Sequence, residues 1–151
     1  MKFQIQQTIN APADHVWEIV GTNFNDISQW ASPVLTSKAN PELGSDEMGR
    51  VCELAGGRQL VETINHYDDD NRQFRFTIGN ESTPFFIKGV ENTWSVKPNG
   101  ANQSTVQINA DIELMSFFNL FSAPLKSGFR KGGERILQDL KAYAEAQPVA
   151  A

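Results

Sequence analysis

The chain has 151 residues, of which 40% are hydrophobic and 21% charged, and this size and composition are typical of one globular domain. Thirteen Lys and Arg residues against eighteen Asp and Glu residues give a net charge of −5 without a cationic stripe, so we expect no nucleic-acid partner. The single cysteine, Cys52, excludes an internal disulfide and a cysteine-rich zinc site. The N-terminal segment lacks a signal-peptide core, and no stretch reaches the roughly 18 apolar residues of a membrane span. We therefore expect a cytoplasmic protein without stable membrane insertion.

The first thirty residues predict one strand followed by two short helices. Residues 2–10 alternate polar and apolar side chains, the period-2 pattern of a half-buried strand. Residues 12–20 then carry an apolar stripe at helical spacing, and Gly21 is expected to end that helix. Phe24, Ile27 and Trp30 recur at helical spacing and predict a second short helix.

Residues 34–114 predict an antiparallel meander, because clusters of turn-forming residues separate six apolar runs. Gly56-Gly57 is the clearest turn, since glycine takes the positive φ that both central positions of a tight hairpin need. Together with the first strand, the runs predict a sheet of seven strands. The six runs span 34–39, 48–55, 58–67, 72–79, 85–97 and 103–114.

The last part of the chain predicts a long amphipathic helix, because apolar residues recur every three or four positions through about Ala146. Three glycines inside it each cost up to about 1 kcal/mol relative to Ala, so Gly128, Gly132 and Gly133 need a packing reason or mark a bend. This helix is the only element long enough to cover the apolar face of the sheet. We predict one α+β domain over residues 1–146, with a curved sheet wrapped around the helix, and a frayed tail over 147–151.

Several short motifs along the chain match those of a known family. They are Ile9-Asn10-Ala11-Pro12 leading into residues 16–20, Trp30 followed by Pro33, Gly49-Arg50, Glu62-Thr63-Ile64 followed by Tyr67-Asp68, and Trp94-Ser95-Val96 with Pro98 and Gly100. In these residues the chain resembles the helix-grip proteins of the START-like superfamily, polyketide cyclase/dehydratase (SRPBCC) type. That superfamily includes lipid carriers, hormone receptors, birch-pollen-type allergens and aromatic cyclases. The resemblance implies a helix-grip fold with a cavity for a hydrophobic ligand between the sheet and the long helix.

Strand alternation identifies the polar side chains that face inward. Leu60 and Ile64 mark the inward face of their strand, so Glu62 lies on the same face, and Arg50 lies on the inward face of the preceding strand. A buried charge is expensive unless it is paired. Glu62 is therefore the leading candidate, as a general acid or base or as a partner of Arg50 that polarises a ligand hydroxyl. The alternatives are a purely structural pair with Arg50 and an exposed glutamate at a curved edge.

The other polar candidates have simpler interpretations. Alternation also places Lys88 and Asn92 inward, although Lys88 lies near a strand start from which its side chain can reach water. His66 adjoins an acidic turn and should be exposed, and His15 has no second histidine at metal-ligand spacing, so we expect no metal. We expect Cys52 to be a small buried residue rather than a nucleophile. No cofactor is expected.

Aromatic side chains are abundant enough to line an apolar pocket or to fill the core. The candidates are Trp30, Phe76, Phe86, Trp94, Phe117, Phe118, Phe121 and Phe129. Residues 117–121 stand out because a loop at this place would otherwise be polar, and they could form a lid, a partner surface, a membrane-touching patch or a plug. The stretch itself lacks a cationic face, so the membrane interpretation ranks last.

Three hypotheses about function follow. The first is the binding of a small hydrophobic or aromatic molecule, with Phe76, Phe86, Trp94 and Phe129 as apolar walls and with Glu62 and Arg50 orienting a polar end. The second is a polyketide cyclase, dehydratase or isomerase in which Glu62 is the general base and Arg50 or Asn92 stabilises an enolate-like oxyanion. The third is a protein-interaction module that uses residues 117–121. The sequence decides neither between enzyme and binding protein nor the oligomeric state.

Overall fold

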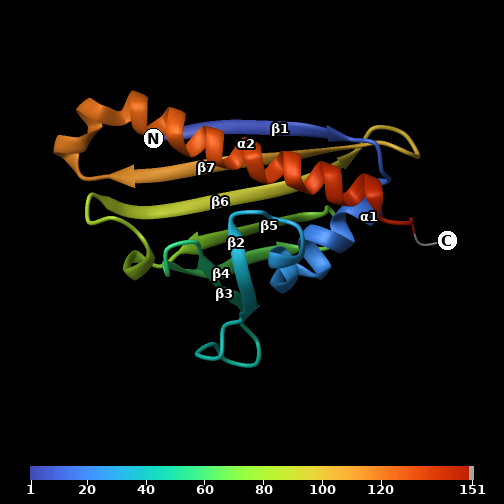
Figure 1. The fold of residues 1–151 in the computed structure, drawn as a ribbon, viewed down its shortest axis with the longest axis horizontal. Coiled ribbons are helices and arrows are strands. Elements are labelled where there is room, and N and C mark those ends of the chain that lie inside the picture. Colours follow the sequence, from blue (N-terminus) through green and yellow to red (C-terminus); the bar gives the residue numbers. More distant parts are fainter. Residues whose placement is uncertain (150–151) are drawn as a thin grey trace.

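A computed structural model describes residues 1–149 as a seven-stranded antiparallel sheet crossed on one face by a long helix (Figure 1). The sheet order is β1-β7-β6-β5-β4-β3-β2, so the meander runs from β2 to β7 and β1 pairs with β7. The strands are β1 (Lys2–Ile9), β2 (Val34–Ala39), β3 (Met48–Leu54), β4 (Gln59–Asp68), β5 (Gln73–Ile78), β6 (Ile87–Pro98) and β7 (Ser104–Leu114). The helical segments are α1 (Ala13–Trp17), η1 (Glu18–Thr22), η2 (Phe24–Gln29), η3 (Asn80–Ser82), η4 (Ser116–Phe121) and α2 (Ser122–Ala146).

The predicted helix-grip fold is confirmed, including all seven strands and the C-terminal helix. The hairpin between β3 and β4 turns at Gly56 and Gly57, whose φ angles are 85° and 77°, as that turn requires. The end of the first short helix was predicted wrongly. The helix continues as a π-helical turn to Thr22, and Gly21 lies inside this turn, where a Cβ would come within 2.6 Å of the Trp17 ring. Gly21 therefore serves close packing rather than termination.

The main core lies between the inner face of the sheet and the second half of α2. Leu137 and Leu140 of α2 are fully buried. Below them Phe74 stacks on Trp94 of the neighbouring strand, with ring centroids 5.9 Å apart. The short helices close one end of this core, and the Trp17 indole N–H donates a 2.7 Å hydrogen bond to Asp69 that ties α1 to the turn after β4.

A β-bulge at the start of β6 changes which side chains face inward. The register shifts between Ile87 and Gly89, so Ile87 and Val90 are both buried. Lys88 consequently points outward and lies 3.8 Å from Glu113. The inward position predicted for Lys88 by simple alternation is therefore wrong, whereas its predicted contact with water is confirmed.

The described part of the chain continues to residue 149 after the end of α2 at Ala146. The Gln147 N–H donates a 3.1 Å hydrogen bond to the Tyr143 carbonyl at the helix end. Of the tail predicted for 147–151, residues 150–151 lie outside the described residues. Within residues 1–149, no helix combines the length and the apolar character needed to cross a membrane.

Candidate functional site

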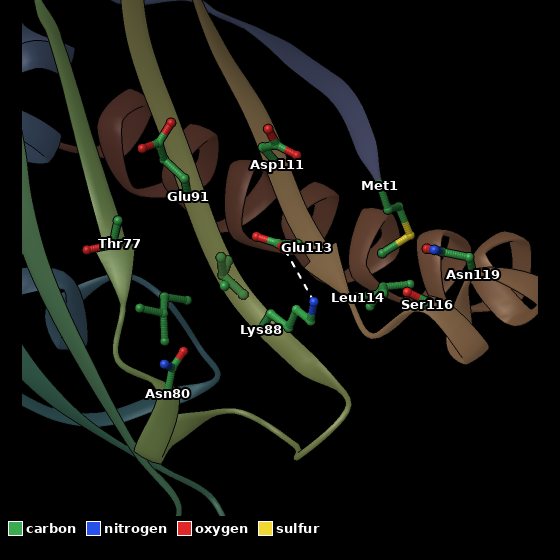
Figure 2. A pocket seen from close by; sticks show the side chains of 13 residues that line it. Met1, Thr77, Asn80, Lys88, Glu91, Asp111, Glu113, Leu114, Ser116 and Asn119 are labelled. Atoms are coloured by element: carbon green, nitrogen blue, oxygen red, sulfur yellow. Dashed lines mark ion pairs between the residues drawn. The ribbon is translucent and has the colours of Figure 1, made fainter.

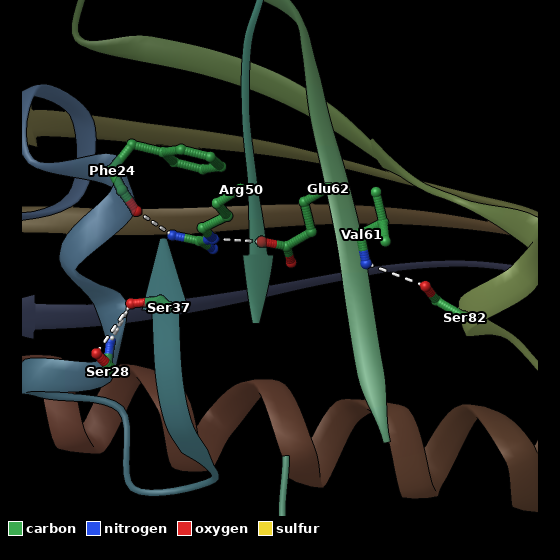
Figure 3. A network of polar contacts seen from close by, with 7 residues as sticks. All are labelled: Phe24, Ser28, Ser37, Arg50, Val61, Glu62 and Ser82. Atoms are coloured by element: carbon green, nitrogen blue, oxygen red, sulfur yellow. Dashed lines mark hydrogen bonds and ion pairs between the residues drawn. The ribbon is translucent and has the colours of Figure 1, made fainter. Parts of the chain in front are cut away.

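Arg50 of β3 and Glu62 of β4 are direct cross-strand partners on the inner face of the sheet. Only 4% and 6% of their surfaces are exposed. Arg50 Nε donates a hydrogen bond to Glu62 Oε2, and Arg50 Nη1 donates another to the carbonyl of Phe24 in η2 (Figure 3). The two charges that sequence parity placed inward therefore meet as a buried ion pair.

Phe24 holds the guanidinium in a second way, because the Arg50 Cζ atom lies 3.9 Å from the centroid of the Phe24 ring. The short helix η2 is itself tied to β2 through Ser28 and Ser37, whose hydroxyl groups are 2.9 Å apart (Figure 3). The pair is thus fixed from the sheet and from the helical cover. Replacing a buried ion pair with apolar residues is often neutral or stabilising, so stability alone does not explain this arrangement.

Cys52 lies on the same inner face as Arg50 and is almost completely buried. Burial and, to a lesser extent, the nearby Glu62 carboxylate raise the pKa of its thiol to about 11, although Arg50 opposes the change. A thiol that stays protonated near neutral pH is a poor nucleophile. The prediction of a small buried residue is confirmed.

The register places an apolar row beside the ion pair. Glu62 pairs across strands with Ile78, and Ile78 pairs with Val90. In the adjacent row Ile64 pairs with Phe76, and Phe76 with Asn92. Ile64, Ile78 and Asn92 keep part of their surfaces accessible although they face the helix side of the sheet. The inner face therefore combines one fixed charge pair with apolar side chains that the core does not fully cover.

Trp30, at the end of η2, packs between two apolar clusters of the interior. Its indole Nε1 is buried and has no hydrogen-bond partner within residues 1–149. A buried N–H without a partner is costly, so it marks a position where an acceptor from another molecule would be favoured.

The structure separates the other predicted aromatic residues into two groups. Phe76 and Trp94 are buried in the core, where both stack on Phe74. Phe86 and Phe118 stack on each other at 5.0 Å at the end of the molecule where α2 begins. Near that end Phe121 and Phe129 are exposed. The predicted set therefore does not surround one common space.

A pocket of about 710 Å³ opens mainly on the outer face of the sheet, on the side away from α2 (Figure 2). Its outward-facing side chains include Lys88 and three carboxylates, Glu91, Asp111 and Glu113, and it reaches the inward-facing Ile78 at the end of β5. This polar groove differs from the apolar cavity that the family resemblance implies. The carboxylates are balanced by cations, as in the 2.8 Å contact between Lys2 and Asp111.

The sequence did not predict the contact of Phe24 with Arg50 or the exposed position of Phe85. Phe24 contacts Arg50 through its carbonyl and ring, but the two residues are 26 positions apart and a backbone carbonyl leaves no trace in a sequence pattern. Phe85 was placed inside a strand, whereas it is 80% exposed in the connection before β6. His66 is exposed, as expected, and His15 Nε2 contacts the Ala144 carbonyl at 3.2 Å. Residues 1–149 contain no group of three or more His, Cys, Asp and Glu side chains placed to hold a metal ion.

The family model described as "polyketide cyclase / dehydrase and lipid transport" matches residues 1–145. The chain belongs to this family. The resemblance inferred from the sequence is therefore confirmed, and it covers nearly the whole domain. No curated protein sequence matches the chain.

Solved structures related to this family member share its fold at low sequence identity. The Zhui aromatase/cyclase from Streptomyces sp. R1128 superposes with a TM-score of 0.78 at 14% identity, over 96% of this chain and 93% of that one. The di-domain aromatase/cyclase BexL from the BE-7585A biosynthetic pathway gives 0.82 at 16% identity, over 96% of this chain and 46% of that one. Ara h 8.0201 gives 0.76 at 9% identity, over 97% and 99%. At these identities the likeness establishes the helix-grip fold.

Proposed function

We propose that the protein binds a small hydrophobic or aromatic molecule between the inner face of the sheet and α2. The observation that carries this proposal is the row in which the buried Arg50–Glu62 pair adjoins the incompletely covered Ile78. Ligand sites typically combine apolar walls with a few fixed polar groups. The Arg50–Glu62 pair would orient a polar end of the ligand, while Ile64 and Ile78 would contact its apolar body.

Trp30 supports the same proposal. Its buried indole N–H lacks a partner among the described residues, so a ligand acceptor would satisfy it. Membership of a family whose description includes lipid transport agrees with an apolar ligand.

The first experiment is native mass spectrometry of the protein as purified from cells, followed by extraction of bound small molecules. A defined co-purifying molecule with an apolar body supports the proposal. In parallel, fluorescence titration with 8-anilinonaphthalene-1-sulfonate supplies a probe that carries an aromatic body and an anionic end. A protein that carries no molecule and does not bind this probe would contradict the proposal.

A matched pair of variants locates the binding site. Ile64→Trp fills the inner face, whereas Thr63→Trp places the same ring on the outer face of the same strand. We expect Ile64→Trp to weaken probe binding at least about tenfold and Thr63→Trp to leave it nearly unchanged. Equal affinities of the two variants would place the probe elsewhere on the protein.

The ion pair needs a double variant, because Glu62→Gln leaves the Arg50 charge buried without its partner. Breaking one side of a buried pair costs about 3–5 kcal/mol, so we expect Glu62→Gln to destabilise the protein. The double variant Arg50→Met, Glu62→Leu removes both charges and should keep the fold. We expect it to lose preference for the anionic probe over an uncharged naphthalene.

The alternative function is enzymatic, as a polyketide cyclase, dehydratase or isomerase with Glu62 as general base. It is favoured by the buried position of the Glu62 carboxylate beside apolar Ile78, where Oε2 is held by Arg50. Arg50 suits the oxyanion role better than Asn92, because Arg50 contacts Glu62 directly. Asn92 lies two strands away and two residues along β6 from the position opposite Glu62, so the two Cα atoms are roughly 12 Å apart by strand geometry.

Deuterium exchange distinguishes the enzyme from the binding protein. α-Tetralone is an apolar ketone, and NMR in deuterated buffer reports how fast its α-protons exchange. An acceleration by the parent that disappears in the Arg50→Met, Glu62→Leu double variant indicates general-base chemistry at this pair. Probe binding without any acceleration favours the binding function.

A further inference from the structure

Four large apolar side chains project into solvent at the end of the molecule where α2 begins. Phe85, Phe117, Leu120 and Phe121 are 80%, 69%, 81% and 50% exposed. We call these four residues the aromatic tip. They come from the β5–β6 connection and from η4, which lie together at the left end of the view in Figure 1.

The aromatic tip rests on an ordered base. Phe85 packs edge-on against Phe86 and Phe118, with centroid distances of 5.6 and 5.7 Å. The two segments are joined by a 2.9 Å hydrogen bond from the Met115 N–H to the Phe86 carbonyl. The folded structure therefore holds the exposed rings in place, although their exposed surfaces contribute nothing to the core.

The segment that carries Phe117, Leu120 and Phe121 has a small local excess of positive charge. Residues 114–133 contain Lys126, Arg130 and Lys131 and no carboxylate, and residues 82–90 contain Lys88 and no carboxylate, while the chain carries −5 overall. Nearby carboxylates engage two of these cations, because Glu113 lies 3.8 Å from Lys88 and Glu134 lies 2.9 Å from Arg130. Lys126 and Lys131 add positive charge to the first turns of α2.

We propose that the aromatic tip docks on the surface of an anionic phospholipid membrane. Exposed aromatic side chains flanked by Lys and Arg are the combination that binds such an interface, with the rings at headgroup depth and the cations near lipid phosphates. The sequence alone ranks a membrane last, because residues 117–121 themselves carry no cation. The cations are instead supplied by the adjoining turns of α2, which the fold places directly after the rings.

A second copy of the chain fits the aromatic tip less well. A symmetric dimer through this surface would bring the same patch, with its cations, onto itself. Like charges placed face to face oppose such an interface. Docking on a membrane does not depend on the proposed ligand site, so the two can be tested separately.

The test is sedimentation of the full chain with vesicles of phosphatidylcholine alone or of phosphatidylcholine with phosphatidylserine. We expect binding to the anionic vesicles, weakening as salt is added. Phe117→Ser, Phe121→Ser should reduce partitioning at least about tenfold, whereas Leu35→Ser, which removes an exposed apolar residue from β2, should not. Lys126→Gln, Lys131→Gln should reduce binding about fivefold per charge, with Lys38→Gln, Lys97→Gln as the control.

Circular dichroism of each variant establishes that it is folded, which is expected because all the altered side chains are exposed. Three outcomes would overturn the proposal. One is a parent protein that binds neither type of vesicle. Another is binding that the phenylalanine and lysine variants leave unchanged. The third is a parent that dimerises in analytical ultracentrifugation and becomes monomeric in Phe117→Ser, Phe121→Ser without any vesicle binding, which would assign the aromatic tip to self-association.

Discussion

The two halves of α2 have opposite relations to the rest of the protein. In the second half Leu137, Leu140 and Ala144 are fully buried against the sheet. In the first half, from Ser122 to Gly132, no residue is buried, and Phe129 is 37% exposed. The helix therefore holds the sheet mainly with its C-terminal half. The exposed apolar residues near its N-terminal half are not explained by packing in the core, and the proposed membrane contacts lie at that end.

The largest effect on the free energy of unfolding is expected from replacing a leucine in the buried half of α2. The comparison is a leucine in η4, which precedes the helix. Leu140→Ala should lower the free energy of unfolding by about 2–5 kcal/mol, because it opens a cavity in a fully buried position. Leu120→Ala, at the exposed aromatic tip, should change it by less than about 0.5 kcal/mol. Urea denaturation followed by tryptophan fluorescence measures both. Similar losses of unfolding free energy in the two variants would show that the exposed end stabilises the fold as much as the buried half of α2 does.

A smaller effect on stability is expected from substituting two glycines of α2, Gly128 and Gly133, which test the same comparison within one helix. A Cβ at Gly133 would lie 2.5 Å from Cδ1 of buried Ile5 in β1, whereas a Cβ at Gly128 would meet no atom within 4 Å. Gly133→Ala should therefore destabilise the protein by about 1 kcal/mol, since overpacking exceeds the gain in helix propensity. Gly128→Ala should stabilise it by up to about 1 kcal/mol.

The same denaturation measurement checks the glycine pair. Gly133→Ala destabilises only if the helix must approach β1 closely at this point. A gain in Gly133→Ala equal to that in Gly128→Ala would mean that Ile5 moves aside without cost. The packing reason expected from the sequence would then apply to none of the tested glycines.

Most of the fold was predictable because local patterns determine it. The period-2 alternation, the Gly56-Gly57 turn and the spacing of apolar residues in α2 each depend on neighbouring residues, and all agree with the observed elements. The bulge at Ile87 and Gly89 was not predictable, because one extra residue in a strand leaves no local signal and reverses which side chains face inward. The extent of the first short helix was also missed, since it depends on how Gly21 packs against Trp17.

The alternation of side chains along the strands predicts only part of the candidate site. Parity places Arg50 and Glu62 on one face of neighbouring strands, and the structure pairs them. Parity does not reveal which side chains of that face remain accessible, because this depends on how the helical cover sits over the sheet. The list of aromatic candidates therefore included both buried Trp94 and exposed Phe121, although they belong to different parts of the molecule.

The smallest effect is expected at Glu145, which ties the buried half of α2 to the end of β1. Its carboxylate accepts hydrogen bonds from Lys141 and, at 2.8 Å, from the Asn10 N–H. The bond from Lys141, more than that from Asn10, lowers the pKa of Glu145 below the usual 4.5. A lowered pKa in the folded state gives stability that is present above about pH 4.5 and is lost as the pH falls through the lowered value.

Glu145→Gln should therefore lower the free energy of unfolding by about 0.5 kcal/mol at neutral pH, a modest value because the carboxylate is largely solvated. The difference from the parent should shrink as the pH falls below about 4.5, because the parent carboxylate is then protonated as well. Glu134→Gln is the matched control, since Glu134 forms the other i,i+4 pair of α2, at 2.9 Å from Arg130, and within residues 1–149 its carboxylate, unlike that of Glu145, accepts no backbone N–H. Urea denaturation of the three proteins across this pH range measures the difference. A Glu145→Gln deficit that persists in acid would assign the effect to packing at the end of β1 rather than to the charge.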